Sequence, residues 1–406
     1  MNSNLAESTK LSTIAQIIDS NLWSPDPEIR EIVRQLREQF GFADEEAGEM
    51  LYAIYKDLNK RLFTPITDIE LMLTEACNLS CAYCFEQKII GAKNMSAEIA
   101  RRAVDFLFDY SFRRKKLRIT FFGGEPTLNL PVIEAVLDYV TVKRRTTHKD
   151  VEFHMTSNGM LIDEGMARLL AERNVRVLVS IDGLKDTHDR FRVDRRGKGT
   201  FDIVIANAMT LKKYQPWIGT KMTVMPETVE SLYDDVKGLA DAGINHFIIG
   251  AASGGEWSAE ALETLRQHLT RIKSLCRKRN RGRRTMRVPQ LVARHPRNPV
   301  FGCQAARSCV CITTQGEISP CARVLALNGR ELVAHLGNLS SGIFKLHTRR
   351  EMVTCRKLRE NCATLGLEKE FQGGCFATNF EESEDLFLPS LNQIRIHDAE
   401  RLSRTP

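Results

Sequence analysis

Cys77-Asn78-Leu79-Ser80-Cys81-Ala82-Tyr83-Cys84 holds three thiols in one short loop, spaced C-x3-C-x2-C, directly after an apolar, strand-like run at residues 68–73. This spacing lets a tight loop wrap three thiolates around one face of a cubic iron–sulfur cluster, whereas a [4Fe–4S] cube needs four ligands to close every iron. One iron is then left open, and an open metal position marks a site that binds a substrate or cofactor. From the cysteines alone, a zinc site or three buried structural thiols are the alternatives.

The same stretch, with the aromatic Tyr83 before its last cysteine, resembles the signature of the radical S-adenosylmethionine (SAM) enzymes. The resemblance implies that Cys77, Cys81 and Cys84 hold the cluster and that the amino and carboxylate groups of SAM chelate its open iron. It also implies that the reduced cluster cleaves SAM to a 5′-deoxyadenosyl radical, while the protein positions the reactive atoms and excludes side reactions.

Length and composition are those of an ordinary globular protein. The 406 residues, 43% of them hydrophobic, can bury one large core plus a smaller domain. No apolar run approaches the roughly 20 residues of a membrane span, and the polar start Met1-Asn2-Ser3-Asn4 lacks the apolar region of a signal peptide. We therefore expect a cytoplasmic protein without a membrane partner, in which metal or cluster ligation explains the eleven cysteines better than disulfides do.

The formal net charge of +7 is moderate for this length. Basic residues gather at 113–116 and 277–284, without interleaved aromatic residues. This pattern favours solvated loops over a nucleic-acid surface, and it would also suit an acidic peptide partner.

Residues 1–65 are predicted to be helical. Ser24-Pro25-Asp26-Pro27 is a helix start signal, the apolar residues that follow have helical spacing, Gly41 is placed as a stop, and a second helix begins near Asp44. The segment either caps the catalytic domain or holds a substrate peptide. Related families often carry a leader-binding winged helix here, but no run of strands supports one.

From Thr67 onwards, predicted strands alternate with predicted helices. The strands are residues 68–73, 117–122, 151–156, 175–181, 219–224 and 246–249, and the helices lie near 96–112, 131–145, 163–173, 200–214, 227–241 and 258–279. Six β/α units in series predict an α/β fold with a parallel sheet. The resemblance implies a partial (β/α)6 TIM-like radical SAM barrel over residues 66–285, followed by an auxiliary-cluster domain over 286–406.

Unusual residues follow the predicted strands, at the end where such folds place their sites. The second strand ends in Gly123-Gly124-Glu125-Pro126. Glycines let the backbone approach a ligand closely, and a carboxylate can accept hydrogen bonds from an ammonium group. The stretch matches the family's GGEP motif, which implies that Gly123, Gly124 and Glu125 meet the amino group of SAM.

The third and fourth strands end in polar side chains that suit a small ligand, although helix capping is the alternative. The resemblance carries Asn158, Ser180 and Asp182 over as SAM contacts. Arg192 is the candidate to pair with the SAM carboxylate, because a guanidinium recognises carboxylates bidentately. Arg195 and Arg196 are alternatives to it.

Beyond the basic linker, the cysteines resemble the SPASM/twitch extension of peptide-modifying radical SAM enzymes. The matching features are Cys303-x5-Cys309, Gly316-x4-Cys321, Leu336-Gly337-Asn338-Leu339 and Gly373-Gly374-Cys375. The resemblance implies that Cys303, Cys309, Cys321 and Cys375 ligate one auxiliary [4Fe–4S] cluster completely, with Cys311 as the alternative to Cys309.

A second auxiliary cluster is not expected, because two cysteines, Cys355 and Cys362, are too few for a cubane. Together with Cys276 and Cys311 they are expected to be small buried hydrophobic residues. Alternatively, one of the four donates hydrogen to a substrate radical, as in resembling peptide epimerases.

The resemblance implies a maturase that modifies a ribosomally made precursor peptide with a leader, by a thioether or carbon–carbon crosslink or a related change, using an external electron donor such as flavodoxin or ferredoxin. The anaerobic sulfatase maturases, which form formylglycine, are the nearest alternative. They place an aspartate directly after the cysteine matched by Cys321, whereas Ala322 and Arg323 follow here. A non-enzymatic iron–sulfur redox sensor is the alternative from another class.

Overall fold

One mixed sheet organises the computed structural model, which describes residues 16, 29–282, 285–292, 301–327, 335–367 and 371–404. Its strands are β1 (Asp68–Met72), β2 (Lys116–Phe122), β3 (Asp150–Ser157), β4 (Val175–Ser180), β5 (Gly219–Val224), β6 (His246–Ala251), β7 (Cys309–Ile312), β8 (Glu317–Ser319), β9 (Gly337–Asn338) and β10 (Gly342–Ile343). They follow the order β10-β9-β8-β7-β1-β2-β3-β4-β5-β6. Strands β1 to β6 pair in parallel with their sequence neighbours, which confirms the predicted parallel α/β core.

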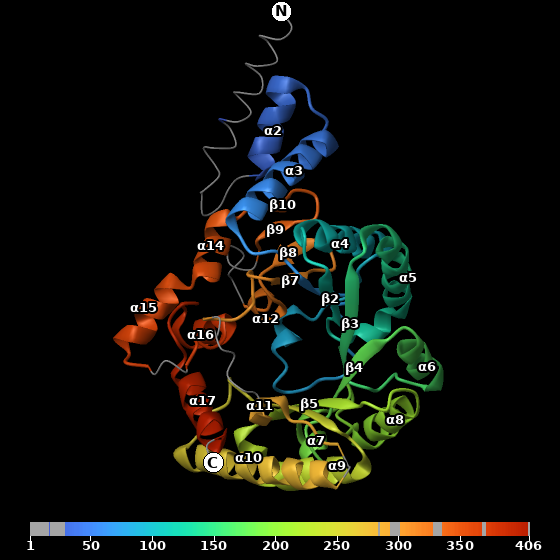
Figure 1. Cartoon of the computed structure of the whole chain (residues 1–406), viewed down its shortest axis with the longest axis vertical. Coiled ribbons are helices and arrows are strands. Elements are labelled where there is room, and N and C mark those ends of the chain that lie inside the picture. Colours follow the sequence, from blue (N-terminus) through green and yellow to red (C-terminus); the bar gives the residue numbers. More distant parts are fainter. Residues whose placement is uncertain are drawn as a thin grey trace, which may run out of the picture.

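Helices connect these strands and cover the outside of the curved sheet (Figure 1). The α-helices are α2 (Ile29–Phe40), α3 (Asp44–Leu62), α4 (Ala97–Tyr110), α5 (Leu130–Thr147), α6 (Glu164–Glu172), α7 (Lys185–Phe191), α8 (Phe201–Tyr214), α9 (Leu232–Ala242), α10 (Ala259–Arg281), α11 (Pro289–Val292), α12 (Ala322–Leu325), α14 (Leu346–Thr354), α15 (Arg356–Thr364), α16 (Phe376–Ser383) and α17 (Leu391–Arg404). Three 3-10 helices are η1 (Phe85–Ile89), η2 (Pro126–Asn129) and η3 (Pro226–Ser231).

The core follows the expected periodicities. On β3, Val151, Phe153 and Met155 alternate with more exposed residues and are buried. Helix α4 begins at the N-cap Ser96, whose hydroxyl accepts a hydrogen bond from the Ile99 amide, and buries a face that includes Leu107. A period of two on strands and of about 3.6 on helices therefore places the apolar side chains between sheet and helices.

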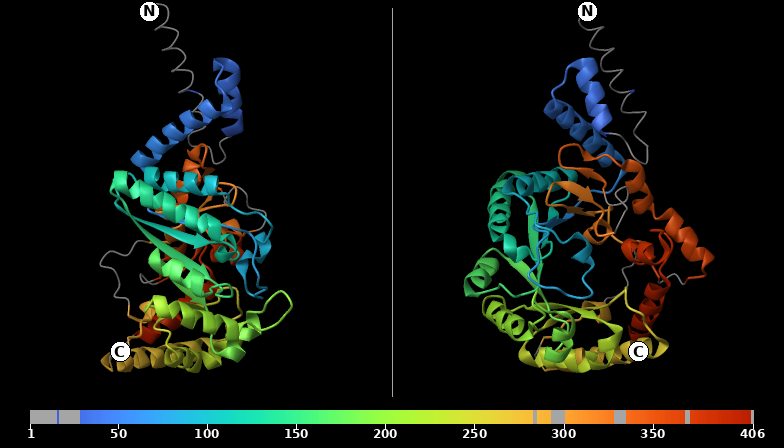
Figure 2. Two further views of the ribbon diagram at one scale, coloured as in Figure 1. Left: turned by 90° about the vertical axis from the view of Figure 1, so that its right-hand side faces the viewer. Right: turned by 180° about the vertical axis from the view of Figure 1, so that it is seen from behind.

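The C-terminal segment spans the open side of the barrel. Strand β7 pairs in parallel with β1, so β7 to β10 extend the same sheet beyond the first barrel strand. At its other end, α17 packs along α10, which follows the last barrel strand (Figure 2). The segment thus bridges the two edges of the barrel. The predicted domain boundaries after residues 65 and 285 stay a proposal.

The N-terminal helices pack on the C-terminal strands. Leu36, Leu51 and Tyr55 form a small buried cluster with Phe344 and Leu346. The predicted start signal at 24–27 lies outside the described residues. The second predicted helix is confirmed as α3, which packs mainly on β10 and also on α4. The predicted role in capping the catalytic domain stays a prediction.

A buried arginine joins the N-terminal helices to the C-terminal segment. Arg349 donates to the backbone oxygens of Ala306 and Thr64, at 2.9 Å each, and to the side chain of Asn59. Its guanidinium lies 4.7 Å from the centre of the Phe63 ring.

No helix in the described part of the chain has the length and apolar character to cross a membrane.

Candidate active site

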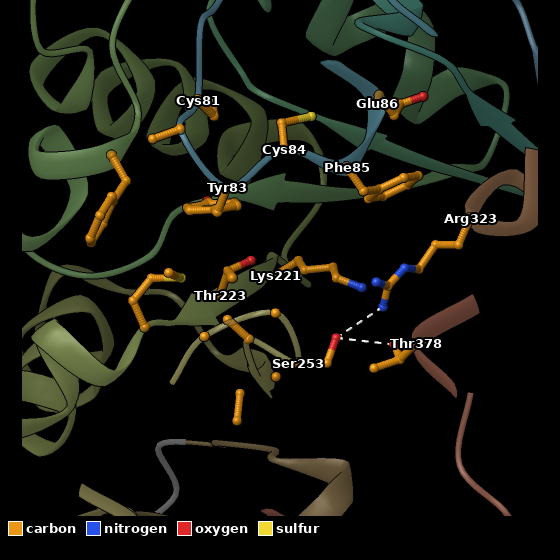
Figure 3. Close-up of a pocket in the computed structure, with 18 of the residues that line it drawn as sticks. Cys81, Tyr83, Cys84, Phe85, Glu86, Lys221, Thr223, Ser253, Arg323 and Thr378 are labelled. Atoms are coloured by element: carbon orange, nitrogen blue, oxygen red, sulfur yellow. Dashed lines mark hydrogen bonds between the residues drawn. The ribbon is translucent and has the colours of Figure 1, made fainter. Parts of the chain in front are cut away.

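A pocket of about 1530 Å³ opens at the carboxyl ends of the barrel strands. Its lining comes from the cysteine loop, the ends of β2 to β5, residues 250–258, and the C-terminal segment. Figure 3 shows side chains from the barrel and from the C-terminal segment facing one another across it. Pockets for a single small molecule measure about 300–1,000 Å³, so this one has room for more than a single small ligand.

The cysteine loop is pinned to residues 191–195. The amide of Ser80 donates to the Val193 oxygen at 2.9 Å, and the Arg195 Nε donates to the Cys77 oxygen at the same distance. Arg195, which the sequence left as an alternative SAM-carboxylate ligand, therefore supports the backbone of the loop.

Cys77, Cys81 and Cys84 all line the pocket. Burial raises the pKa of each thiol, and the neighbouring cysteines raise it further, because thiolates at close range repel one another. Among the described residues, no three His, Cys, Asp or Glu side chains converge closely enough to hold a single metal ion. The thiols therefore line the pocket as three separate side chains.

Two predicted cofactor contacts lie next to these sulfurs. The Asn158 Nδ2 is 3.8 Å from the Cys77 sulfur and donates to Asn78 at 2.7 Å. The Arg192 Nη1 lies 4.0 Å from the Cys81 sulfur. Ser180 lines the same pocket, and the contact of all three residues with SAM stays a prediction.

Gly123 and Gly124, which follow β2, allow two backbone segments to pack closely. Gly123 has a φ of +123°, and a Cβ there would lie 2.4 Å from the Thr74 oxygen; at Gly124 it would lie 2.3 Å from the Ala76 oxygen. The sequence predicted that these glycines let a ligand come close to the backbone. In the structure they let the backbone of residues 74–76, which leads to Cys77, pack closely against them. Both glycines also line the pocket, and their contact with SAM stays a prediction.

The Glu125 carboxylate is committed to donors within the protein. It accepts hydrogen bonds from the Thr127 amide and hydroxyl at 3.1 and 2.6 Å, from the Ser157 hydroxyl at 2.8 Å and from the Asn158 amide at 2.7 Å. The side chain is 1% exposed. Through these bonds, Glu125 links the end of β2 to the end of β3. A contact of its carboxylate with the SAM ammonium group stays untested.

Replacing Gly124 by Ala is expected to lower the free energy of unfolding by about 1–3 kcal/mol and to reduce iron incorporation, because backbone atoms cannot yield to the added methyl group. Denaturant unfolding and iron analysis check this. Gly165→Ala, in the exposed first turn of α6, is the matched control, since its Cβ would meet an ordinary contact at 3.5 Å. Equal effects of the two substitutions would contradict the prediction.

Asp182 is the centre of a buried hydrogen-bond network. It accepts from Arg192 Nε at 2.8 Å and Nη2 at 3.3 Å, from the Thr223 amide at 2.8 Å, and from the Tyr83 hydroxyl. Tyr83 and Arg192 line the pocket, whereas Asp182 lies behind them and is 3% exposed. The geometry gives Asp182 a positioning role. Its direct contact with SAM stays a prediction.

Comparison with known proteins identifies the region that holds this site. Residues 71–239 match the model of the Radical SAM superfamily. The chain carries a radical SAM domain. The match covers the cysteine loop and strands β2 to β5, which form one wall of the pocket.

Two curated relatives are similar to this chain. It is 30% identical over 144 residues to a cysteine-type anaerobic sulfatase-maturating enzyme of Clostridium novyi, covering 34% of this chain and 38% of the relative. It is 25% identical over 247 residues to the radical SAM cyclopropyl synthase TigE of Paramaledivibacter caminithermalis, covering 56% and 51%. The chain thus spans about half or less of the length of these relatives.

The fold is also that of a solved structure, native anSMEcpe with bound AdoMet and Cp18Cys peptide. The TM-score is 0.64 at 19% identity, over 84% of this chain and 96% of that one. At this identity the likeness shows the fold alone. It extends beyond the radical SAM domain into the C-terminal segment.

Charge–charge effects link the four predicted auxiliary ligands, which lie beside the radical SAM domain. Burial raises the pKa of Cys303 to about 11 and that of Cys321 to about 12, and Cys375 adds to both shifts. Burial raises the pKa of Cys309 too, with contributions from Cys303 and Cys321. Cys311 is fully buried among Met72 and Ala322. Because Cys321 and Cys309 also act on the pKa of Cys311, the choice between Cys309 and Cys311 and the ligand set as a whole stay predictions.

The remaining cysteines are buried in the protein interior, as the sequence predicted for them. Cys276, Cys355 and Cys362 belong to the large apolar core. The Cys355 thiol donates to the Met352 oxygen at 2.9 Å. The cysteines that line the described pocket are those of the 77–84 loop, so its geometry does not support Cys276, Cys311, Cys355 or Cys362 as a hydrogen donor to a substrate there.

Sequence reasoning did not propose three charged pocket residues, Glu86, Lys221 and Arg323, as site residues. Glu86, 7% exposed, lines the pocket, and burial raises its pKa to about 7 with contributions from Glu125 and Glu70. Lys221 from β5 and Arg323 from α12 also line the pocket, and their cationic ends point toward each other (Figure 3). Lys221, the one charged residue of the predicted strand 219–224, was a signal that could have been used, since lysine is depleted in strands.

Proposed function

We propose that the chain is a radical SAM peptide maturase that cleaves SAM reductively and removes a hydrogen from a residue of a ribosomally synthesised precursor peptide. The product is a thioether or carbon–carbon crosslink or a related modification. The observation that carries the proposal is one pocket that joins the cysteine loop to the C-terminal segment. The cofactor and a peptide residue can therefore meet in the same enclosed space.

The residues present suit a cluster with one open iron. Cys77, Cys81 and Cys84 supply three soft sulfur donors on one wall of the pocket, and Asn158 and Arg192 supply amide and guanidinium groups to a ligand beside them. A bound [4Fe–4S] cluster together with SAM would supply one-electron chemistry that yields a carbon radical. The chain's own contribution is to hold the substrate carbon within reach and to exclude water.

A second cluster is proposed at Cys303, Cys309, Cys321 and Cys375, whose mutual proximity supports four thiolate ligands from one region. Reconstituted protein is then expected to contain about eight irons per chain. Replacing Cys375 by Ala should lower this to about four while the cluster at Cys77 remains. Iron analysis of both proteins checks this. About twelve irons would mean that Cys355 and Cys362 recruit a third cluster.

The proposed partners are a precursor peptide with a leader and an external electron donor such as flavodoxin or ferredoxin. The peptide is supported by the named activity of the sulfatase-maturating relative, and by a structure of the same fold that holds AdoMet and a peptide. We also propose that α2 and α3 cap the C-terminal segment, on which they pack.

Formylglycine formation in a sulfatase is the second candidate, because a relative with that named activity matches the radical SAM domain. The residues after Cys321 weigh against it. Ala322 is apolar, and Arg323 is a cation bound to Glu381 at 2.9 Å, so neither residue after Cys321 carries the expected aspartate side chain.

The proposed function is tested with anaerobically reconstituted full-length protein, SAM and dithionite. We expect release of methionine and 5′-deoxyadenosine. A reduced iron–sulfur protein that releases no 5′-deoxyadenosine under these conditions would be a redox sensor and not this enzyme. Mass spectrometry of a sulfatase-derived Cys peptide separates the second candidate, since formylglycine formation from Cys leaves a characteristic mass loss.

A further inference from the structure

Two cationic side chains from different parts of the chain meet inside the pocket. Lys221 comes from the middle of β5, where it stands opposite Ser180 in the sheet register, and Arg323 comes from α12. Figure 3 shows the Lys221 amine directed away from Cys81 and Tyr83 and toward the Arg323 guanidinium. Both residues line the pocket. The pair therefore reaches from the strand beside Ser180, a predicted cofactor contact, to the C-terminal segment.

Arg323 is fixed in place by three neighbours. Its Nη2 donates to Glu381 at 2.9 Å, its Nη1 donates to the Ser253 hydroxyl at 3.2 Å, and its guanidinium lies 5.6 Å from the centre of the Phe85 ring. The Thr378 hydroxyl bonds to the same Ser253 oxygen at 3.2 Å. These contacts hold the cation at a defined position at the pocket wall, while its Nε has no partner among the described residues.

The side-chain amine of Lys221 has neither an ion pair nor a hydrogen bond to the residues that the structure describes. Burial lowers its pKa, and Arg323 and, less strongly, Arg192 lower it further, because cations at close range disfavour each other's charge; Glu70 acts in the opposite direction. The Glu70 carboxylate accepts from the Ala322 amide at 3.3 Å. Arg323 is already ion-paired with Glu381, so Lys221 is the cation of the two whose charge lacks a partner among the described residues, and an anionic ligand would supply one.

We propose that Lys221 and Arg323 bind a carboxylate of the substrate, so that the peptide places an Asp or Glu side chain, or its C-terminal carboxylate, next to the residue that is modified. This deepens the proposed function and rests on it. An ammonium and a guanidinium both donate charge-assisted hydrogen bonds to carboxylates. A singly charged group suits the site better than a phosphate dianion, because Glu381 and Glu86 share the same pocket.

The test measures binding, not turnover, on the anaerobically reconstituted full chain in the presence of SAM. The probes are acetyl-Ala-Glu-Ala-amide, its Gln counterpart, and acetyl-Ala-Gln-Ala with a free C-terminal carboxylate. Equilibrium dialysis is expected to show binding of at least one acidic probe about 10-fold or more tighter than the neutral Gln amide. The acidic probe that binds more tightly than the neutral amide shows whether the carboxylate comes from a side chain or from the C-terminus.

Lys221→Gln should remove this preference and leave the neutral probe unaffected, and Lys221→Arg should restore it. Lys88→Gln is the matched control, since Lys88 is a second pocket-lining lysine outside the pair, and it should keep the preference. Iron content and the unfolding midpoint verify that each variant is folded.

Equal binding of all three probes, no measurable binding of either acidic probe, or a preference that survives Lys221→Gln would overturn the proposal. An effect of Lys221→Gln confined to SAM affinity would also overturn it, by assigning the lysine to the cofactor. Because 5′-deoxyadenosine release is measured separately in the same preparation, a failure here is distinguishable from a failure of the proposed function.

Discussion

Replacing Cys77, Cys81 and Cys84 together by Ala is expected to abolish release of 5′-deoxyadenosine from SAM and to remove about four irons from each chain. The three thiols lie on one wall of the pocket, on a loop held to residues 191–195 by backbone hydrogen bonds. Alanine supplies no donor atom, so neither the cluster nor its open iron can form. Iron analysis and product chromatography measure both consequences.

Cys276→Ala is the matched control for this prediction. Cys276 lies on α10, is 3% exposed, and belongs to the apolar core outside the pocket lining. Its loss should leave the iron content and SAM cleavage at their original levels, with a stability cost of about 1 kcal/mol for the small cavity. Retention of SAM cleavage in the triple variant would remove the basis of the proposed function.

Replacing Asp182 by Ala is expected to lower the free energy of unfolding by about 3–5 kcal/mol, because it leaves the Arg192 guanidinium buried without its partner. The two side chains are 3% and 8% exposed, and they share two hydrogen bonds. SAM affinity should fall about 10-fold or more, since Tyr83 and Arg192 both lose the group that orients them in the pocket wall. Denaturant unfolding and SAM binding measure the two effects.

Two further variants separate positioning from simple structural damage. Asp182→Ala combined with Arg192→Met should recover much of the lost stability, because the unpaired charge is gone, yet SAM affinity should stay low. Glu263→Ala breaks an exposed ion pair with Arg266 and should leave the unfolding midpoint nearly unchanged. Recovery of both stability and SAM affinity in the double variant would contradict the positioning role.

The sequence predicted the barrel strands and the cysteine loop well, because both signals are local. Strand 219–224 was expected and is β5 with the same bounds, and the loop 77–84 lies at the pocket as its spacing indicated. The pairing of β7 with β1 and the packing of α17 on α10 were not predictable, since nothing in local periodicity specifies which distant segments meet.

The predicted roles of individual side chains were less accurate, because these roles also depend on which distant segments meet. Glu125 and Asp182 were expected as ligands of a small molecule, but their carboxylates are bonded to groups from neighbouring strands and loops. Such internal donors become visible only when the chain is folded. Lys221 and Arg323 likewise come near each other although they are about a hundred positions apart, and no sequence motif predicts this.

The central claim is an iron–sulfur cluster on Cys77, Cys81 and Cys84 that leaves one iron for SAM. Electron paramagnetic resonance of the dithionite-reduced protein, recorded before and after SAM is added, tests it most directly. A variant without Cys375 leaves a single cluster to observe. We expect a clear change in the signal of that cluster on addition of SAM. A signal that SAM leaves unchanged, or zinc in place of iron at this loop, would contradict the account.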